Sequence, residues 1–325
     1  FNNSKLYKIE TMNQTASSNC ACWIKSMGIG DLCILIANIH AISKSAGKPV
    51  VVLAQRSTAA TSILSRDPFI KEVVELDKKG FFNILKKIKP YKFDQSYIYS
   101  DSIRLYLIAK MAGIKNIFHY KFFSKKRKNF FKTAKEFTEK ILDIKIDSQS
   151  KIYCDKNDIE NAKRKYNITS ATKNYIISPS ASGPTKRWPI SNFIKLLEEL
   201  NKKHLGKYFI AAGPNDENLV KELLDSSIGK NCISLSKNNI SEIMPIIAAC
   251  SYNISNDTGF AHIASGLGLK CLVLFMDSPP LAYGVYSKNI SIVVPDGETI
   301  ESTGHNTRGK ISFVEVLKKS LELIS

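Results

Sequence analysis

Long apolar runs are absent from the sequence. Nowhere do about eighteen apolar residues follow one another, so we find no candidate for a membrane-spanning helix. Residues 1–18 are polar, begin with Phe1 and lack the apolar stretch of a secretory signal, and we treat them as an N-terminal extension. The sequence has no Asp-x-Asp pair suited to holding Mg²⁺ against a diphosphate. We therefore expect neither a metal site nor a cofactor.

Cysteine pairs at metal-binding spacing are also lacking. Cys20 and Cys22 are separated by one residue rather than two, and no second pair follows them. The remaining cysteines are scattered, and Cys33, Cys250 and Cys271 lie in apolar runs, as reduced core cysteines do. This pattern predicts a protein of the reducing cytosol.

Acidic residues are few relative to basic ones. The chain has 47 Lys and Arg against 29 Asp and Glu, a formal net charge of +18. Nucleic acid, an anionic membrane surface and phosphorylated small molecules are the candidate partners of such a chain. The segment 120–132 interleaves basic and aromatic residues. It fits a lipid headgroup contact and equally a solvated loop whose aromatic side chains pack inward.

The pattern of apolar runs predicts two successive α/β domains. With 44% hydrophobic residues, 325 residues can form two cores. Short apolar runs alternate with amphipathic stretches, which is the βαβα pattern of a doubly wound parallel sheet. We predict strands at 19–25, 49–54, 72–76, 94–99 and 116–119, then at 175–177, 208–212, 233–235, 252–254, 270–275 and 290–294. The predicted parts are an extension (1–18), two Rossmann-like domains (19–170 and 171–310) that face one another across a cleft, and a C-terminal helix (311–325).

The stretch Ser255–His262 has the composition of a phosphate-binding turn. It follows a short apolar strand and precedes a run of small and apolar residues typical of a tightly packed helix. Asn256 or Asp257 is suited to capping that helix, and Gly259 lets a ligand approach the backbone. Unpaired N–H groups at a helix N-terminus favour phosphate. An ordinary helix cap, with His262 as a core histidine, explains the same residues.

Three further positions carry groups that could act in catalysis or binding. Asp31 follows Gly28 and Gly30, which leave room for a sugar, so its carboxylate could act as a general base; a helix cap is the alternative. Lys186 could neutralise a diphosphate leaving group, or be one more surface lysine. Asp216 and Glu217 follow Gly213 at a strand end, where acidic residues bind ribose or begin a helix.

Taken together, these motifs resemble one known family. Their order, from Asn19 onward, resembles that of the ADP-heptose–lipopolysaccharide heptosyltransferases, which are family 9 glycosyltransferases of the GT-B fold. The motifs are Met-Gly-Ile-Gly-Asp (27–31), Ser-Pro-Ser-Ala (178–181), Lys-Arg-Trp-Pro (186–189), Gly-Pro-Asn-Asp-Glu (213–217) and Asn-Asp-Thr-Gly-Phe-Ala-His (256–262).

The resemblance implies an inverting, metal-independent transfer of heptose from ADP-heptose to the lipopolysaccharide inner core. Asp31 would be the base and Lys186 a catalytic, phosphate-contacting cation. Ser180, Lys186, Gly213, Asp216, Glu217, Asp257, Thr258, Gly259 and His262 would bind the donor, and Gly30, Arg56 and Arg66 would lie on the acceptor side. The partners would be an ADP-sugar and an anionic lipid-linked glycan rather than nucleic acid. The site of action would be cytoplasmic, with peripheral contact to the inner membrane.

Other functions fit parts of the same evidence. A family 9 transferase with another nucleotide-sugar donor would share the motifs. A nucleotide-sugar epimerase has a similar two-domain architecture but needs no acceptor-facing basic surface. A non-catalytic nucleotide- or polyanion-binding protein could have kept the fold.

Overall fold

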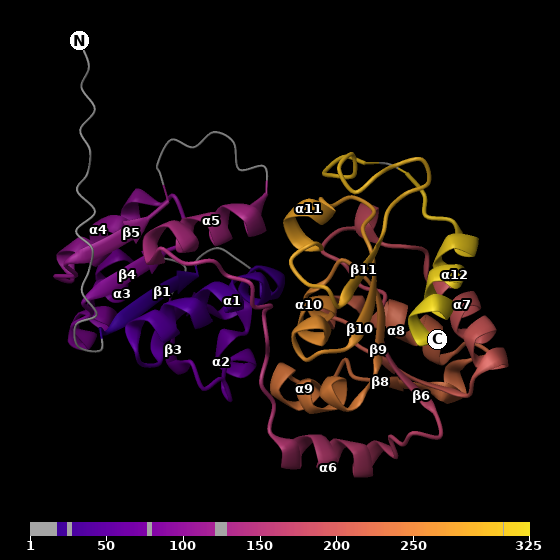
Figure 1. Cartoon of the computed structure of the whole chain (residues 1–325). Coiled ribbons are helices and arrows are strands. Elements are labelled where there is room, and N and C mark those ends of the chain that lie inside the picture. Colours follow the sequence, from indigo (N-terminus) through magenta and orange to yellow (C-terminus); the bar gives the residue numbers. More distant parts are fainter. Residues whose placement is uncertain (1–17, 25–27, 77–79, 121–128, 308) are drawn as a thin grey trace.

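Two parallel β-sheets, each flanked by helices, follow one another along the chain (Figure 1). The computed structural model describes residues 18–24, 28–76, 80–120, 129–307 and 309–325. This confirms the predicted α/β class with two Rossmann-like domains. The basic and aromatic segment 120–132 falls largely outside the described residues.

The first sheet has the strand order β3-β2-β1-β4-β5. Its central strand β1 is buried on both faces, because Cys22 and Ile24 pack under α1 while Ala21 and Trp23 pack under α3 and α4. Such double burial is typical of parallel sheets. The elements of this domain are β1 (Cys20–Ile24), α1 (Ile29–Ala46), β2 (Val50–Gln55), η1 (Arg56–Thr58), α2 (Ala60–Ile63), β3 (Ile70–Leu76), α3 (Phe81–Ile88), η2 (Lys89–Tyr91), β4 (Gln95–Ile98), α4 (Ile103–Met111), β5 (Asn116–His119) and α5 (Phe130–Leu142).

The second sheet has the strand order β11-β10-β9-β6-β7-β8. From β6 the chain extends the sheet on one side with β7 and β8, and then on the other side with β9, β10 and β11. Ligands of open α/β sheets bind at the point of this reversal, between β6 and β9, beyond the carboxyl ends of the strands. The elements are β6 (Lys173–Ser178), η3 (Pro184–Lys186), α7 (Ile190–Lys203), β7 (Gly206–Ile210), η4 (Pro214–Asp216), α8 (Glu217–Leu224), η5 (Gly229–Asn231), β8 (Cys232–Ser234), α9 (Ile240–Ala249), β9 (Tyr252–Asn256), α10 (Gly259–Gly266), β10 (Lys270–Leu274), α11 (Pro280–Tyr283), β11 (Ile290–Val293) and α12 (Phe313–Ile324).

The chain crosses between the domains earlier than residue 170, where the sequence placed the boundary. Helix α6 (Lys156–Tyr166) already packs against α9 of the second domain (Figure 1). Its last residue, Tyr166, lies edge-on to Phe209 of β7. The C-terminal helix α12 packs on α7 and on strands of the second sheet rather than standing apart. The crossing segment is therefore 143–155.

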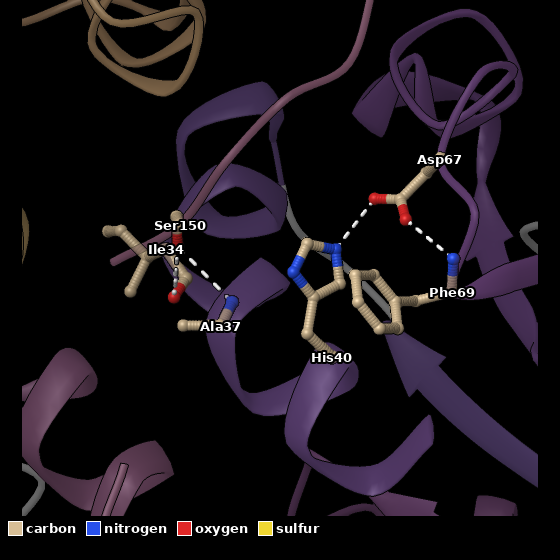
Figure 2. Close-up of polar contacts among 6 residues, drawn as sticks. All are labelled: Ile34, Ala37, His40, Asp67, Phe69 and Ser150. Atoms are coloured by element: carbon tan, nitrogen blue, oxygen red, sulfur yellow. Dashed lines mark hydrogen bonds and ion pairs between the residues drawn. The ribbon is translucent and has the colours of Figure 1, made fainter. Parts of the chain in front are cut away.

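The crossing segment is hydrogen-bonded to both domains. The Ser150 hydroxyl accepts from the Ala37 N–H at 3.3 Å and donates to the Ile34 carbonyl at 3.4 Å, both in α1 (Figure 2). Two residues later, the Ile152 N–H donates to the Gly266 carbonyl at the end of α10 at 2.8 Å. The connection between the domains is thereby fixed to α1 and α10.

All the predicted strands are present. The seven cysteines are free thiols, and Cys33, Cys250 and Cys271 are buried as expected. Burial raises the pKa of Cys20 to about 12, so this thiol stays protonated.

Candidate active site

Asp31 lies in the first turn of α1, which begins at Ile29. The Gly28 N–H donates to Asp31 Oδ2 at 2.8 Å, so one carboxylate oxygen caps the helix while the other is left for a ligand. Burial raises the pKa of Asp31, and the Gly28 hydrogen bond and the charge of His262 offset this only in part. The capping and the base interpretations therefore apply to the same side chain.

The first turns of α1 and α10 touch, and glycine makes this contact possible. A Cβ atom on Gly30 would lie 2.8 Å from Cδ2 of His262, and a Cβ on Gly259 would lie 2.9 Å from Cβ of Ile29. The two helix N-termini, one from each domain, therefore meet. Each presents unpaired N–H groups and the positive end of its dipole, the arrangement that favours a bound phosphate.

Asp257 is held in place by residues of its own domain. Its Oδ1 lies 3.4 Å from His262 Nε2, and its Oδ2 accepts from the Ser278 hydroxyl. Burial alone would raise the pKa of Asp257. Hydrogen bonds from His262 and Ser278, together with the Lys186 ammonium, outweigh burial and lower the pKa, so the carboxylate is ionised at neutral pH. The capping prediction for Asn256 and Asp257 is wrong, because Thr258 is the N-cap of α10.

The loop that carries Lys186 is fastened to β9 by Asn256. The Asn256 amide donates to the Pro179 carbonyl at 2.7 Å and accepts from the Trp188 N–H at 3.0 Å. Lys186 is half-buried, and its charge lowers the pKa of Asp257 and of Asp277. Asn256 thus fixes the position of the lysine relative to the turn at 257–259. Ser180 lies buried in the same loop.

Two tyrosines that the sequence did not single out also belong to the site. The Tyr286 hydroxyl lies 3.0 Å from His262 Nδ1, and Tyr286 is buried. An ionised Asp257 can only accept, so His262 Nε2 carries a proton, and the Tyr286 hydroxyl holds the Nδ1 side of the ring. Burial first, and then the charges of Asp31 and Asp257, raise the pKa of Tyr283. Their only sequence signal was their place after β10, at the same sheet edge.

The turn after β7 is joined to the Lys186 loop by an ion pair. Arg187 Nη2 lies 2.6 Å from Asp216 Oδ1, and it also donates to the Ala181 carbonyl. One oxygen of Asp216 is thus held in this ion pair. Glu217 is exposed at the start of α8, four residues beyond Gly213, which is the N-cap of η4.

The two arginines expected on the acceptor side lie at different edges of the first sheet. Arg56 is exposed directly after β2, at the carboxyl edge that Asp31 also follows. Arg66 lies at the amino edge, because its neighbour Asp67 pairs with His40 of α1 at 2.7 Å (Figure 2). The prediction for Arg66 is therefore wrong in position: the loop after α2 returns the chain to the start of β3.

A metal centre and a membrane-spanning helix are both absent from the described ranges. Within them, no three His, Cys, Asp or Glu side chains gather as a metal site would require. Within the same ranges, no helix has both the length and the apolar character needed to cross a membrane.

Comparison with known proteins relates this arrangement to one family. Over 123 residues the chain is 26% identical to lipooligosaccharide heptosyltransferase 2 of Haemophilus influenzae, which covers 37% of this chain and 36% of that protein. The match thus spans about a third of that relative's length. Among solved structures, the fold matches E. coli ADP-heptose LPS heptosyltransferase II with a TM-score of 0.75 and 16% identity, covering 94% of this chain and 98% of that one. The family 9 glycosyltransferase of Veillonella parvula matches with a TM-score of 0.80 and 16% identity, covering 96% and 98%.

The family itself is assigned from the sequence. Residues 84–310, more than half of the chain, match the family described as glycosyltransferase family 9 (heptosyltransferase). The matched region contains Lys186 and the turn at 257–259 but begins after Asp31, whose assignment therefore depends on the contacts described above. The chain belongs to glycosyltransferase family 9.

Proposed function

We propose that this protein transfers heptose from ADP-heptose to an acceptor of the lipopolysaccharide inner core, with inversion and without a metal ion. The observation that carries the proposal is the meeting of the α1 and α10 N-termini, with Asp31 on one side and Asp257, His262 and Lys186 on the other. The heptosyltransferase names of the relatives support this choice of sugar and acceptor.

The proposed step is a single displacement at the anomeric carbon. An acceptor hydroxyl attacks, its oxygen forms the new bond, and its proton passes to the free oxygen of Asp31. On the opposite face of the sugar, the bond to the β-phosphate breaks and ADP leaves with the electron pair. The raised pKa of Asp31 suits a base, since a more basic carboxylate takes a proton more readily.

The leaving diphosphate would be stabilised by fixed charges. Lys186, the α10 N-terminus and the backbone of Thr258 and Gly259 supply positive charge and N–H donors where negative charge develops. These groups do what a metal ion does in other transferases. His262 would donate from Nε2–H, held in place by Tyr286. Tyr286 is a positioning residue in this scheme.

The donor nucleotide would lie on the second domain and the acceptor on the first. Glu217, which is exposed, and Asp216, which is paired with Arg187, are the candidates for the ADP ribose, with Ser180 and Gly213 lining the same loops. Arg56, which is exposed directly after β2, would meet an anionic, lipid-linked glycan acceptor. Such an acceptor would place the enzyme in the cytoplasm, at the inner face of the inner membrane.

Mass spectrometry of the acceptor after incubation with ADP-heptose tests the proposal. A mass gain of one heptose, undiminished by EDTA, and an anomeric configuration opposite to that of the donor by NMR would support it. Loss of activity in EDTA or retention of configuration would overturn the mechanism. A thermal shift with UDP but not ADP, or with neither, would overturn the donor assignment in favour of another nucleotide sugar or of a non-catalytic protein.

A further inference from the structure

An apolar stripe is exposed on the first domain, well apart from the site. Ile103, Leu107 and Met111 of α4 have exposed fractions of 55%, 45% and 54%, and Phe82 of the neighbouring α3 has 74%. The three α4 residues are spaced four apart, so they lie on one side of the helix. Helices α3 and α4 contact one another, so these four exposed side chains lie on two adjacent helices. We call these four residues the outer patch.

The outer patch faces away from the second domain. Helices α3 and α4 cover the same face of the first sheet, whereas the helices that meet the second domain, α1, α2 and α5, cover the other (Figure 1). Large apolar side chains that cluster in the open mark an interaction surface, while scattered ones need no explanation.

The charged side chains on the two helices of the outer patch are all basic, although the exposed Asp101 lies just before α4. Segments 80–93 and 102–115 contain no Asp or Glu. Lys86, Lys89 and Lys110 are exposed on the two helices and the turn that follows α3. Apolar side chains rimmed by lysines match a bilayer of anionic phospholipid, in which acyl chains take the apolar groups and headgroup phosphates pair with the ammonium groups.

The patch also has a useful position relative to Asp31. Phe82 and Ile103 lie in the first turns of α3 and α4, which follow the carboxyl ends of β3 and β4. Asp31 follows the carboxyl end of β1 in the same sheet. A membrane seated at Phe82 and Ile103 therefore lies along the edge that the acceptor must reach.

We propose that the outer patch docks the protein on the anionic surface of a phospholipid bilayer, with Phe82, Ile103, Leu107 and Met111 entering the headgroup region and Lys86, Lys89 and Lys110 pairing with lipid phosphate. The value of this docking for catalysis rests on the proposed function, because it brings a lipid-linked acceptor to the enzyme. Binding to the bilayer does not depend on catalysis.

Co-sedimentation with vesicles tests the proposal on the full chain. The vesicles are phosphatidylcholine alone or with about 30% phosphatidylglycerol. We expect binding to the mixed vesicles only, weakened when salt rises from about 0.1 to about 1 M. Combining Phe82→Ser, Ile103→Ser and Leu107→Ser should weaken binding on the order of tenfold or more, because the apolar contact is lost. Lys86→Gln with Lys110→Gln should remove the preference for anionic lipid.

A matched control separates the patch from general loss of apolar surface. Val314, Leu205 and Leu224 of the second domain have exposed fractions of 74%, 61% and 39%, close to those of the three replaced residues. Their combined replacement by serine should leave vesicle binding unchanged. The proposal would be overturned if both triple variants lost vesicle binding equally, or if the patch variant bound vesicles as well as the wild type. It would also be overturned if the wild type did not bind vesicles. So would a dimer in sedimentation that only the patch variant dissociates.

Activity measurements distinguish failure of docking from failure of the proposed function. The patch variant should retain wild-type turnover of a delipidated, water-soluble acceptor and lose turnover of an acceptor embedded in vesicles. Equal loss on both acceptors would overturn the docking role. If neither acceptor is turned over by the wild type, the proposed function fails, while the vesicle result still decides the docking surface.

Discussion

Replacing Gly30 by alanine should drive a methyl group into the His262 ring. The new Cβ would lie 2.8 Å from Cδ2 and 3.0 Å from Nε2, well inside van der Waals contact. Moving the ring would be costly, because it is buried and contacts Tyr286 at Nδ1 and Asp257 at Nε2. The clash must then be relieved by separating α1 from α10.

The cost can be bounded from known substitutions. Overpacking a buried contact costs about 1–3 kcal/mol. Against this, alanine in a helix gains up to about 1 kcal/mol over glycine. We expect a net loss of about 1–2 kcal/mol in the free energy of unfolding. For domains of this size, that corresponds to a fall in Tm of about 2–8 °C.

Thermal unfolding and transfer assays measure this effect. Activity should fall along with stability, because separating α1 from α10 moves Asp31 away from Asp257 and His262. Gly304→Ala serves as the control, since a Cβ at that position meets nothing within 4 Å. Adding His262→Ala to Gly30→Ala removes the ring and should recover the lost stability, with a coupling of about 1 kcal/mol or more. A Gly30→Ala variant with wild-type Tm and full activity would refute the packing of His262 on α1.

Three further variants test the chemistry. Asp31→Asn should keep donor binding, because the amide oxygen still accepts from Gly28, but should lower kcat by about 10²–10⁴. In the wild type, activity should fall as pH drops through the raised pKa of Asp31; an acid limb at the ordinary Asp pKa of about 3.9 would contradict this. Lys186→Ala should weaken ADP binding in calorimetry, and unchanged affinity would count against its role. Tyr286→Phe should lower kcat and shift the pH profile through His262, whereas Tyr175→Phe, which removes a buried hydroxyl without a partner among the described residues, should change neither.

The fold could be predicted from the sequence because each strand is a short apolar run between turn residues. Parallel order then brings all the carboxyl ends to one edge. The loops carrying Asp31, Lys186 and Asp257 were expected together for this reason, and the charge effects among them agree.

The features that could not be predicted depend on contacts between residues far apart in the sequence. The start of α1 is hard to predict from the sequence, because Gly30 in its first turn has a low helix propensity. The packing of Gly30 against His262 joins residues far apart in the sequence. Asn256 is of a residue type that often caps helices, yet its side chain joins the loop at Pro179 to β9. Arg66 was misplaced because spacing does not tell which edge a short helix leads to. Tyr286 carries no motif at all.

The Ser150 hydroxyl is hydrogen-bonded to the backbone of α1, the helix that carries the candidate base in its first turn. Any swing of one domain against the other must pull on residues 143–155, and the pull reaches the amide of Ala37 directly. From there it can travel along two turns of helix towards Asp31. A change in the angle between the domains would therefore act on the helix that carries Asp31 as well as on the contact between α1 and α10.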